Sequence, residues 1–492
     1  MFPALPAPAK VQLIQHPAPI SGDAWSSLDH LLVIAAKGDA SALNGNAALA
    51  GLASKTHDRE KETVTLAAGE QLVTIGRLAA DATPFEMLEA ARKWIAGIRA
   101  HKPASLGLAF AGLENERSSA VAEAVVAALL AAEFEMPKIV SKADENKHAV
   151  RELHIFGLEE ERDFTHTLAT AEGTNLARWF AALPGNYLTP GKYREYVETL
   201  AKDFGWKTEF LDETALKQKN AGAFLAVVQG SEDRDAGILH LRYEPAKAAK
   251  NAKPVALVGK GICFDTGGNN LKTGKSMFGM HGDMQGSAVA LGTLIALTRL
   301  QADFPVDCWM ALAQNHIGPK AYKMNDVVTA SDGTTIEILH TDAEGRMVLA
   351  DTLALASNAK PSFIMDFATL TGTCVASLGT RYSGVFTNRE ELGAELIAAG
   401  KRSGERVWPF PQDRDYDELL ESKVADVKQC LIEGEADHIL AGRFLNRFVK
   451  HDTPWVHVDL SASEVKGGLA HVPSEFTGFG VRFATEYLLT NR

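Results

Sequence analysis

The chain has 492 residues, and at roughly 150 residues per domain this length predicts two or three domains. Hydrophobic residues make up 46% and charged residues 23%, a composition typical of globular proteins and unlike that of disordered or fibrous chains. The 50 Lys and Arg against 62 Asp and Glu leave a net charge of −12, which repels phosphate backbones and disfavours nucleic acid as a partner.

Three features of the sequence indicate in which cellular compartment the protein works: the amino-terminal segment, the apolar runs and the cysteines. Residues 2–8 contain three prolines and no basic stretch ahead of a long apolar one, so we expect no secretory signal. The most apolar run, residues 124–132, lies between two glutamates and is far shorter than the roughly 20 residues that cross a bilayer. The four cysteines show no metal-binding spacing. We therefore expect a cytoplasmic protein, in a reducing compartment and away from membranes.

The first third of the chain alternates between strand-like and helix-like segments. Apolar runs at 31–36, 106–111 and 153–156 predict strands, and the Ala-rich segment 119–134 predicts a helix. This alternation indicates an α/β domain. Because it contains no catalytic constellation, we expect it to serve assembly or regulation.

The remainder of the chain repeats this alternation more strongly. Near-continuous apolar segments at 255–258, 306–313 and 363–367 predict central strands covered on both faces. Helix-like segments at 288–300 and 347–358 have lengths that suit crossover connections. We therefore expect a larger catalytic α/β domain with a central mixed sheet flanked by helices.

A charged stretch at 159–163 separates these two parts of the chain. It predicts a smaller amino-terminal α/β domain over residues 1–163. The larger catalytic domain is then expected over residues 164–492.

Two segments place unusual residues directly after expected strands. Residues 258–268 run from an apolar strand into Lys260, Asp265 and paired glycines. Residues 340–346 follow a strand-like segment and contain two acids. Because ligand sites in α/β sheets lie at the carboxyl ends of strands, we expect the chemistry of the protein here.

Four carboxylates belong to these segments and to the stretch that follows the first: Asp265, Asp283, Asp342 and Glu344. In an extended backbone, Asp342 and Glu344 would project to the same face. Carboxylates suit divalent metals, and carboxylates that bridge two ions build sites with ions about 3.5–4 Å apart. The spacing alone leaves two interpretations open: a dinuclear metal centre, or acids that cap helices and pair with Lys and Arg.

The combined pattern resembles the leucyl aminopeptidase family, also called cytosol aminopeptidases. The residues that carry the resemblance are Gly259-Lys260-Gly261, Phe264-Asp265, Gly267-Gly268, Lys272, Met280, Asp283, Thr341-Asp342-Ala343-Glu344-Gly345-Arg346 and Ala368-Thr369-Leu370-Thr371-Gly372. The resemblance covers most of the chain after about residue 180, and the first domain only loosely. It implies a metal-dependent aminopeptidase that releases amino-terminal residues, preferably leucine-type, from peptides with a free amino terminus.

The resemblance also implies two divalent metal ions per subunit, Mn²⁺ or Zn²⁺. One ion would be held by Asp265, Asp342 with its main-chain carbonyl, and Glu344. The other would be held by Lys260, Asp265, Asp283 and Glu344. A lysine ligand must be neutral, and two adjacent dications lower its pKa enough for that.

By the same resemblance, a hydroxide that bridges the metals attacks the peptide carbonyl and Lys272 stabilises the oxyanion. Arg346 would hold a bicarbonate ion that acts as general base. The alternative for Arg346 is a salt bridge to a nearby carboxylate. The pocket for the first side chain is implied to be lined by Met280, Thr369, Leu370 and Gly372. The alternative for this set is simple core packing.

Several residues depart from the family pattern. The departures are His340 in place of Asn, Thr266 in place of Ser, and Asn269-Asn270, His281-Gly282 and Gln285. We expect His340 to shape substrate binding or to form local hydrogen bonds rather than to bind metal. These changes affect the expected side-chain preference more than the expected activity. The family resemblance further implies a homohexamer.

Other enzyme classes lack their motifs. Gly274-Lys275-Ser276 resembles the end of a P-loop, but five residues separate Gly268 from Gly274 where the motif has four. There is no GxSxG motif, and no His is followed by Glu, which excludes the serine-hydrolase elbow and the HExxH zinc site. The remaining alternative is a non-catalytic DNA-binding or structural member of the same family. The acidic charge and the intact ligand set favour catalysis.

Overall fold

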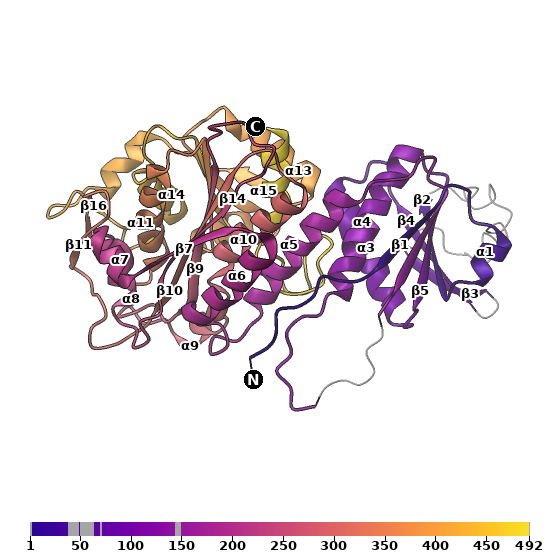
Figure 1. Ribbon diagram of the computed structural model, residues 1–492, viewed down its shortest axis with the longest axis horizontal. Coiled ribbons are helices and arrows are strands. Elements are labelled where there is room, and N and C mark those ends of the chain that lie inside the picture. Colours follow the sequence, from indigo (N-terminus) through magenta and orange to yellow (C-terminus); the bar gives the residue numbers. More distant parts are fainter. Residues whose placement is uncertain (1, 38–48, 50–62, 69–70, 143–148, 492) are drawn as a thin grey trace.

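The computed structural model describes residues 2–37, 49, 63–68, 71–142 and 149–491. Figure 1 shows two lobes, one formed by the indigo and purple first part of the chain and one by the magenta to yellow remainder. Each lobe is a sheet with helices packed against it. The predicted class, a smaller amino-terminal α/β unit followed by a larger one, is confirmed. The exact boundary after residue 163 stays a prediction.

The first lobe contains a six-stranded sheet in the order β1-β6-β5-β2-β4-β3. Its strands are β1 (Gln12–His16), β2 (His30–Ala36), β3 (Thr63–Ala68), β4 (Gln71–Leu78), β5 (Ser105–Ala111) and β6 (Glu152–Phe156). The pairs are parallel except β3 with β4. Its helices are α1 (Gly22–Ser26), α3 (Pro84–Arg99) and α4 (Asn115–Glu133). The expected strands β2, β5 and β6 and the expected helix α4 are all present.

The second lobe contains an eight-stranded sheet in the order β15-β14-β17-β13-β9-β10-β8-β7. Its strands are β7 (Lys207–Asp212), β8 (Gly237–Tyr243), β9 (Val255–Asp265), β10 (Val306–Asn315), β13 (Phe363–Ala368), β14 (Ser383–Thr387), β15 (Val407–Pro409) and β17 (Trp455–Asp459). The central strands β17, β13, β9 and β10 are parallel, and β14, β8 and β7 add antiparallel pairs. The predicted mixed sheet is confirmed, and its apolar central strands are buried on both faces.

A third, small sheet contains β11 (Val327–Thr329), β12 (Thr335–Glu337) and β16 (Val427–Lys428). The sequence predicts a strand at 335–339 immediately before the second acidic segment. This strand is shorter than expected and belongs to the small sheet rather than to the central one. The acids at 342 and 344 therefore reach the site from a turn and a helix start, and not from the end of a central strand.

Thirteen helical segments belong to the described part of the second lobe. They are α5 (Thr165–Ala181), α6 (Pro190–Phe204), α7 (Glu213–Gln218), α8 (Gly222–Val228), α9 (Gly274–Met277), η2 (Met280–Gly282), α10 (Gln285–Arg299), α11 (Glu344–Asn358), α12 (Gly372–Leu378), α13 (Leu392–Ser403), η3 (Arg414–Leu420), α14 (Asp437–Asn446) and α15 (Val481–Thr490). Helix α10 is buried around its whole circumference over residues 285–297. It approaches α5 so closely that a Cβ added to Gly173 would lie 2.1 Å from the carbonyl oxygen of Gly292.

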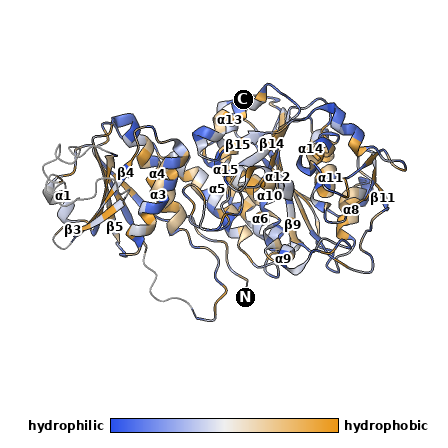
Figure 2. Cartoon of the chain, turned by 180° about the vertical axis from the view of Figure 1, so that it is seen from behind, coloured by the Kyte–Doolittle hydropathy of each residue, from blue (hydrophilic) through white to orange (hydrophobic). Residues whose placement is uncertain are grey.

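The apolar core runs between the lobes. One cluster of buried side chains extends from the first sheet through α4 and α5 to α10. Figure 2 shows hydrophobic colour concentrated on the strands and the inner helix faces, with hydrophilic colour on the outer loops. The four cysteines are buried and carry free thiols. In the described part of the chain, none of the helices has the length and apolar character that a bilayer crossing needs.

A buried acid between α13 and β15 predicts a pH dependence of stability. Glu405 is 5% exposed, and its Oε2 accepts hydrogen bonds from the backbone N–H groups of Gly480 and Phe483, each at 2.9 Å. Burial raises the pKa of the Glu405 carboxyl to about 7, although these hydrogen bonds and Arg482 act in the opposite direction. The folded state therefore binds a proton that the unfolded state has already released between about pH 4.5 and 7.

Stability is accordingly expected to fall as pH rises through this window and to level off above it, by at most about 1.4 kcal/mol per pH unit for one proton. Glu405→Gln keeps the hydrogen-bond acceptor and removes the charge. Its melting temperature should therefore rise relative to that of the parent as the pH increases from 5 to 7. Glu421→Gln, which removes an exposed charge, is the matched control. An unchanged difference between Glu405→Gln and the parent across this range would contradict the assignment.

Candidate metal centre

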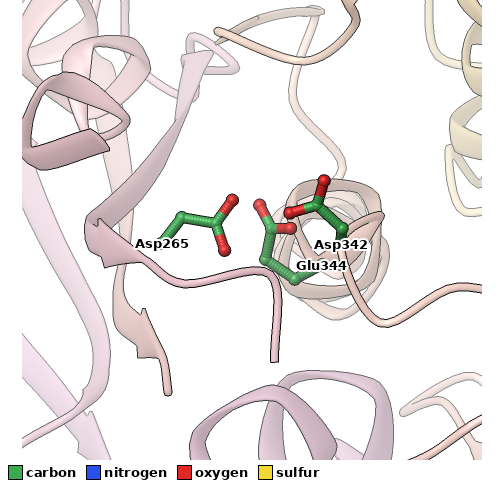
Figure 3. A group of neighbouring side chains, drawn as sticks. All are labelled: Asp265, Asp342 and Glu344. Atoms are coloured by element: carbon green, nitrogen blue, oxygen red, sulfur yellow. The ribbon is translucent and has the colours of Figure 1, made fainter. Parts of the chain in front are cut away.

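Three carboxylates converge beside the carboxyl end of β9, a central strand of the large sheet. Asp265 is the last residue of β9, Asp342 lies in the turn before α11, and Glu344 is the first residue of α11. One oxygen from each side chain lies within 4.8 Å of the other two. Figure 3 shows the three carboxylates pointing toward one another. Three carboxylates this close together repel one another unless cations lie between them.

The expectation of an extended backbone at Asp342 and Glu344 is wrong. Residues 341 and 342 form a turn, and the helix begins at Glu344. The two side chains nevertheless meet because the turn brings Asp342 beside the first turn of the helix. The sequence spacing predicted that these two side chains lie together, and they do, although the backbone conformation differs from the expected one.

Lys260 and Asp283 complete the set of predicted ligands. The Lys260 Nζ lies 2.8 Å from Asp283 Oδ1 and 3.0 Å from Glu344 Oε1, and it donates to the Thr369 carbonyl at 2.9 Å. Burial lowers the pKa of Lys260, but the carboxylates of Asp283, Glu344 and Asp265 outweigh it, so the pKa is raised overall. In the absence of a metal ion, these carboxylates therefore favour the charged form of Lys260, and metal binding by its nitrogen would require the proton to leave.

The donor set fits divalent cations. Glu344 and Asp283 are 1% and 6% exposed, and Glu344 Oε2 and Asp283 Oδ2 have no hydrogen-bond partner among the described residues. Burial and the neighbouring Asp265 raise the pKa of the Glu344 carboxyl, so its charged form needs a further cation. A Cβ added to Gly345 would lie 2.6 Å from Lys260 Cε, which leaves room here only for glycine. Buried, unpaired carboxylate oxygens are suitable ligands for Mn²⁺ or Zn²⁺.

Lys272 reaches the same cluster from the loop after β9. Its Nζ lies 3.0 Å from Asp265 Oδ2 and 2.7 Å from Asp342 Oδ1. Burial lowers the pKa of Lys272, but Asp265, Asp342 and Glu344 outweigh this effect and raise it overall. The side chain is 15% exposed, so this second ammonium faces the cavity described below.

Asn315, at the end of β10, is a positioning residue that sequence reasoning missed. It is fully buried and pairs in register with Asp265. Its Nδ2 donates to Asp265 Oδ1 at 2.8 Å and to the Thr341 carbonyl at 3.0 Å. Tyr322 donates to the same carbonyl at 2.7 Å. A polar residue at the end of a mostly apolar strand was the available signal.

Two of the departures from the family pattern form local hydrogen bonds. Asn270 Oδ1 accepts from the Thr341 backbone N–H at 2.9 Å, and the Asn270 N–H donates to Thr341 Oγ1 at 2.8 Å. His340 Nδ1 accepts from the Asp342 N–H at 3.3 Å. His340 is not one of the three residues whose ligand atoms converge. Local hydrogen bonding is thus the role that the structure gives to both.

Arg346 is 2% exposed and forms the salt bridge that the sequence left open as an alternative. Its Nη2 donates to Asp437 Oδ2 at 2.8 Å, and its Nη1 donates to the Gln429 carbonyl at 3.0 Å. The Nε is buried without a partner among the described residues. The guanidinium thus retains a buried donor with no acceptor, while its role toward bicarbonate stays a prediction.

A cavity of about 460 Å³ opens onto the acid cluster. The four residues predicted for the first side chain, Met280, Thr369, Leu370 and Gly372, all line it. Thr369 also donates from Oγ1 to Asp283 Oδ1 at 2.7 Å, so this wall is joined to the predicted ligands.

Asp459, at the end of β17, is a second residue that sequence reasoning missed. It is 2% exposed and accepts hydrogen bonds from the Leu370 and Thr371 N–H groups at 3.1 and 3.4 Å. The Thr371 hydroxyl donates to its other oxygen at 2.6 Å. Asp459 therefore fixes the loop that lines the predicted pocket. An acid directly after an apolar strand is the signal that had marked Asp265.

Comparisons with known proteins agree with this geometry. A model of the cytosol aminopeptidase family, catalytic domain, matches residues 175–485. The probable cytosol aminopeptidase of Persephonella marina is 37% identical, over 76% of this chain and 76% of that relative. That of Pseudomonas fluorescens is 41% identical, over 67% of this chain and 66% of the relative.

Two solved structures are similar over nearly the whole chain. A mutant tomato leucine aminopeptidase is similar with a TM-score of 0.87 and 27% sequence identity. The similarity covers 100% of this chain and 98% of the tomato chain. The bottromycin maturation enzyme BotP in complex with Mn is similar with a TM-score of 0.80 and 31% sequence identity. The similarity covers 94% of this chain and 98% of the BotP chain. The chain therefore belongs to the cytosol aminopeptidase family and is a metal-dependent aminopeptidase, a hydrolase that acts on peptides.

Proposed function

We propose that the protein releases amino-terminal residues from peptides at a two-metal centre held by Lys260, Asp265, Asp283, Asp342 and Glu344. The observation that carries this proposal is the convergence of three carboxylates around buried Lys260 and partly buried Lys272, with carboxylate oxygens left unpaired. Paired divalent ions bound there would activate water and polarise the peptide carbonyl. The leucine-type preference that the family resemblance implies suits the apolar side chains of Met280 and Leu370.

The residues of the chain orient the substrate within the cavity. When bound, the metal ions would also hold the free amino group of the peptide at this end of the cavity, which would confine cleavage to the first residue. Lys272 carries its ammonium beside Asp265 and Asp342, where it donates a hydrogen bond to the carbonyl oxygen as negative charge develops. Its partial burial strengthens this interaction, since the local dielectric constant is below that of water.

The direct test is hydrolysis of leucine amide by protein stripped with a chelator and then reloaded with Mn²⁺ or Zn²⁺. We expect activity only after reloading, and none toward leucine amide acetylated at its amino group. Absence of hydrolysis of any free-amino-terminal substrate with either metal would contradict the proposed function.

We further propose that Arg346 holds bicarbonate, whose chemistry is to carry protons in the reaction. The support is its buried Nε without an acceptor. Bicarbonate added to carbonate-free enzyme is expected to raise kcat about tenfold or more. Because Asp437 occupies Nη2, Asp437→Asn should lower the bicarbonate concentration for half-maximal stimulation, and Arg346→Met should abolish the response. An unchanged bicarbonate response in Arg346→Met would contradict the assignment.

We propose two domains, 1–163 and 164–492, the first serving assembly or regulation, in a cytoplasmic homohexamer. The support is the family membership together with the separate sheets of the two lobes. Light scattering is expected to give a mass near six times 52.9 kDa. A monomer at micromolar concentration would contradict the hexamer.

A further inference from the structure

The cavity that opens onto the acid cluster has a second wall that the family pattern did not indicate. It is formed by the segment after β17 and by Glu475. The polar residues of this wall include Ser461, Ser463, Glu464 and Lys466. Gln285, at the start of α10, lines the same cavity.

This wall is continuous with the pocket predicted for the first side chain. Asp459 holds the Leu370 loop through backbone hydrogen bonds, so the residues that follow Asp459 extend the same surface. Glu464 forms an antiparallel bridge with Phe476, and the Val465 N–H donates to the Glu475 carbonyl at 2.8 Å. The two glutamates thus stand on adjacent, paired segments.

Gln285 belongs to this corner of the cavity as well. A Cβ built on Gly282 would lie 2.7 Å from the Phe476 ring and 3.5 Å from Gln285 Nε2. The amide of Gln285 is therefore near Phe476, which is the residue paired with Glu464.

Two largely buried polar residues in this corner line the cavity. Gln285 and Ser463 are each 4% exposed, and no side-chain hydrogen bond among the described residues involves the Gln285 amide or the Ser463 hydroxyl. Both side chains line the cavity. Neither the Gln285 amide nor the Ser463 hydroxyl is among the fully enclosed atoms without a partner, so both are accessible from the cavity and available to a polar group of a ligand.

The charge at the mouth is negative. Glu464 and Glu475 are exposed there, and neither forms an ion pair within the part of the chain that the structure describes. Partial burial and the nearby Glu475 charge raise the pKa of the Glu464 carboxyl. Lys466 is the single ammonium group on this wall, against two carboxylates.

We propose that this wall lets the cavity accept a positively charged first residue, arginine or lysine, beside leucine-type residues, and favours it over an uncharged residue of the same shape. The apolar stem of such a side chain would contact Met280 and Leu370 and the head group would reach Glu464, Glu475 and Ser463. The proposal rests on the proposed function, because it assigns this cavity to the first side chain of the substrate.

The test compares arginine with citrulline, its uncharged analogue of nearly equal shape, as coumarin amides with Mn²⁺-loaded enzyme. The ratio of kcat/KM for arginine over citrulline is expected to be about ten or more in the parent, since hydrogen bonds to charged groups are the stronger ones. Glu464→Gln and Glu475→Gln should each lower this ratio severalfold, and Lys466→Gln should raise it. Glu421→Gln, an exposed acid away from the cavity, should leave the ratio unchanged.

The ratio in the parent should also fall as salt is added, because the mouth is exposed to solvent. A parent ratio near one, or a ratio that Glu464→Gln does not lower, overturns the proposal while leaving the aminopeptidase function intact. Failure to hydrolyse leucine, citrulline and arginine substrates alike would instead count against the proposed function. These two failures are therefore distinguishable.

Discussion

Glu344→Gln is expected to lower kcat/KM for leucine amide by at least about a thousandfold with Mn²⁺ present. Glu344 is the member of the cluster that lies against both Lys260 and the Asp265–Asp342 pair. An amide of the same size keeps the packing but loses one negative charge and one ligand oxygen. The bound metal, measured by elemental analysis, should fall below that of the parent.

Stability separates this explanation from misfolding. The Glu344 carboxylate is buried and repelled by neighbouring acids, so its neutral replacement relieves repulsion in the metal-free protein. Metal-free Glu344→Gln should melt at or above the metal-free parent, while added Mn²⁺ should stabilise the parent and not the variant. Glu421→Gln is the control for the loss of one charge. An activity loss below tenfold would contradict the two-metal centre.

Much of the large sheet was predictable because its central strands are apolar on both faces. The runs at β9, β10 and β13 could be recognised without knowledge of their neighbours. The small sheet that contains β12 could not be predicted, because a three-residue strand carries no periodic pattern and its partner β16 is distant in sequence. Strand order likewise depends on tertiary packing rather than on local propensity.

The site likewise contains residues that the sequence could predict and residues whose place depends on tertiary packing. Asp265, Asp342 and Glu344 were predictable because acids after apolar segments are chemically unusual and match a specific motif. The Arg346–Asp437 pair could not be predicted, since it joins residues 91 positions apart through the packing of α11 and α14. The wall at Ser463 and Glu464 has no periodic pattern, and its place in the cavity follows from the position of β17 beside β13.

The cluster also explains why two lysines lie among acids. Lys260 is 3% exposed and Lys272 lines the cavity, and together they offset part of the charge of four carboxylates. They differ in surroundings: Lys260 contacts the Thr369 carbonyl deep in the site, while Lys272 contacts Asp265 and Asp342 from the loop. This difference supports the proposal that Lys260, once deprotonated, binds metal and that Lys272 interacts with the substrate.

Lys272→Met is therefore expected to lower kcat for leucine amide by about 10²- to 10³-fold, the cost of removing one oxyanion-stabilising donor. KM should change much less, because the ammonium interacts most strongly with charge that develops only in the transition state. Bound Mn²⁺ should stay close to the parent value, since the carboxylates around the metals are retained. This result would separate Lys272 from Glu344, whose loss should remove metal as well.

A transition-state analogue provides the decisive measurement for Lys272. The phosphonic acid analogue of leucine places negative oxygens where the tetrahedral intermediate has them, so its affinity should fall by about the same factor as kcat/KM in Lys272→Met. Lys272→Arg keeps the charge in a different shape and should recover part of this affinity. If Lys272→Met instead lost metal in proportion to activity, Lys272 would be a residue that holds the acid cluster together, because its Nζ lies within 3.0 Å of Asp265.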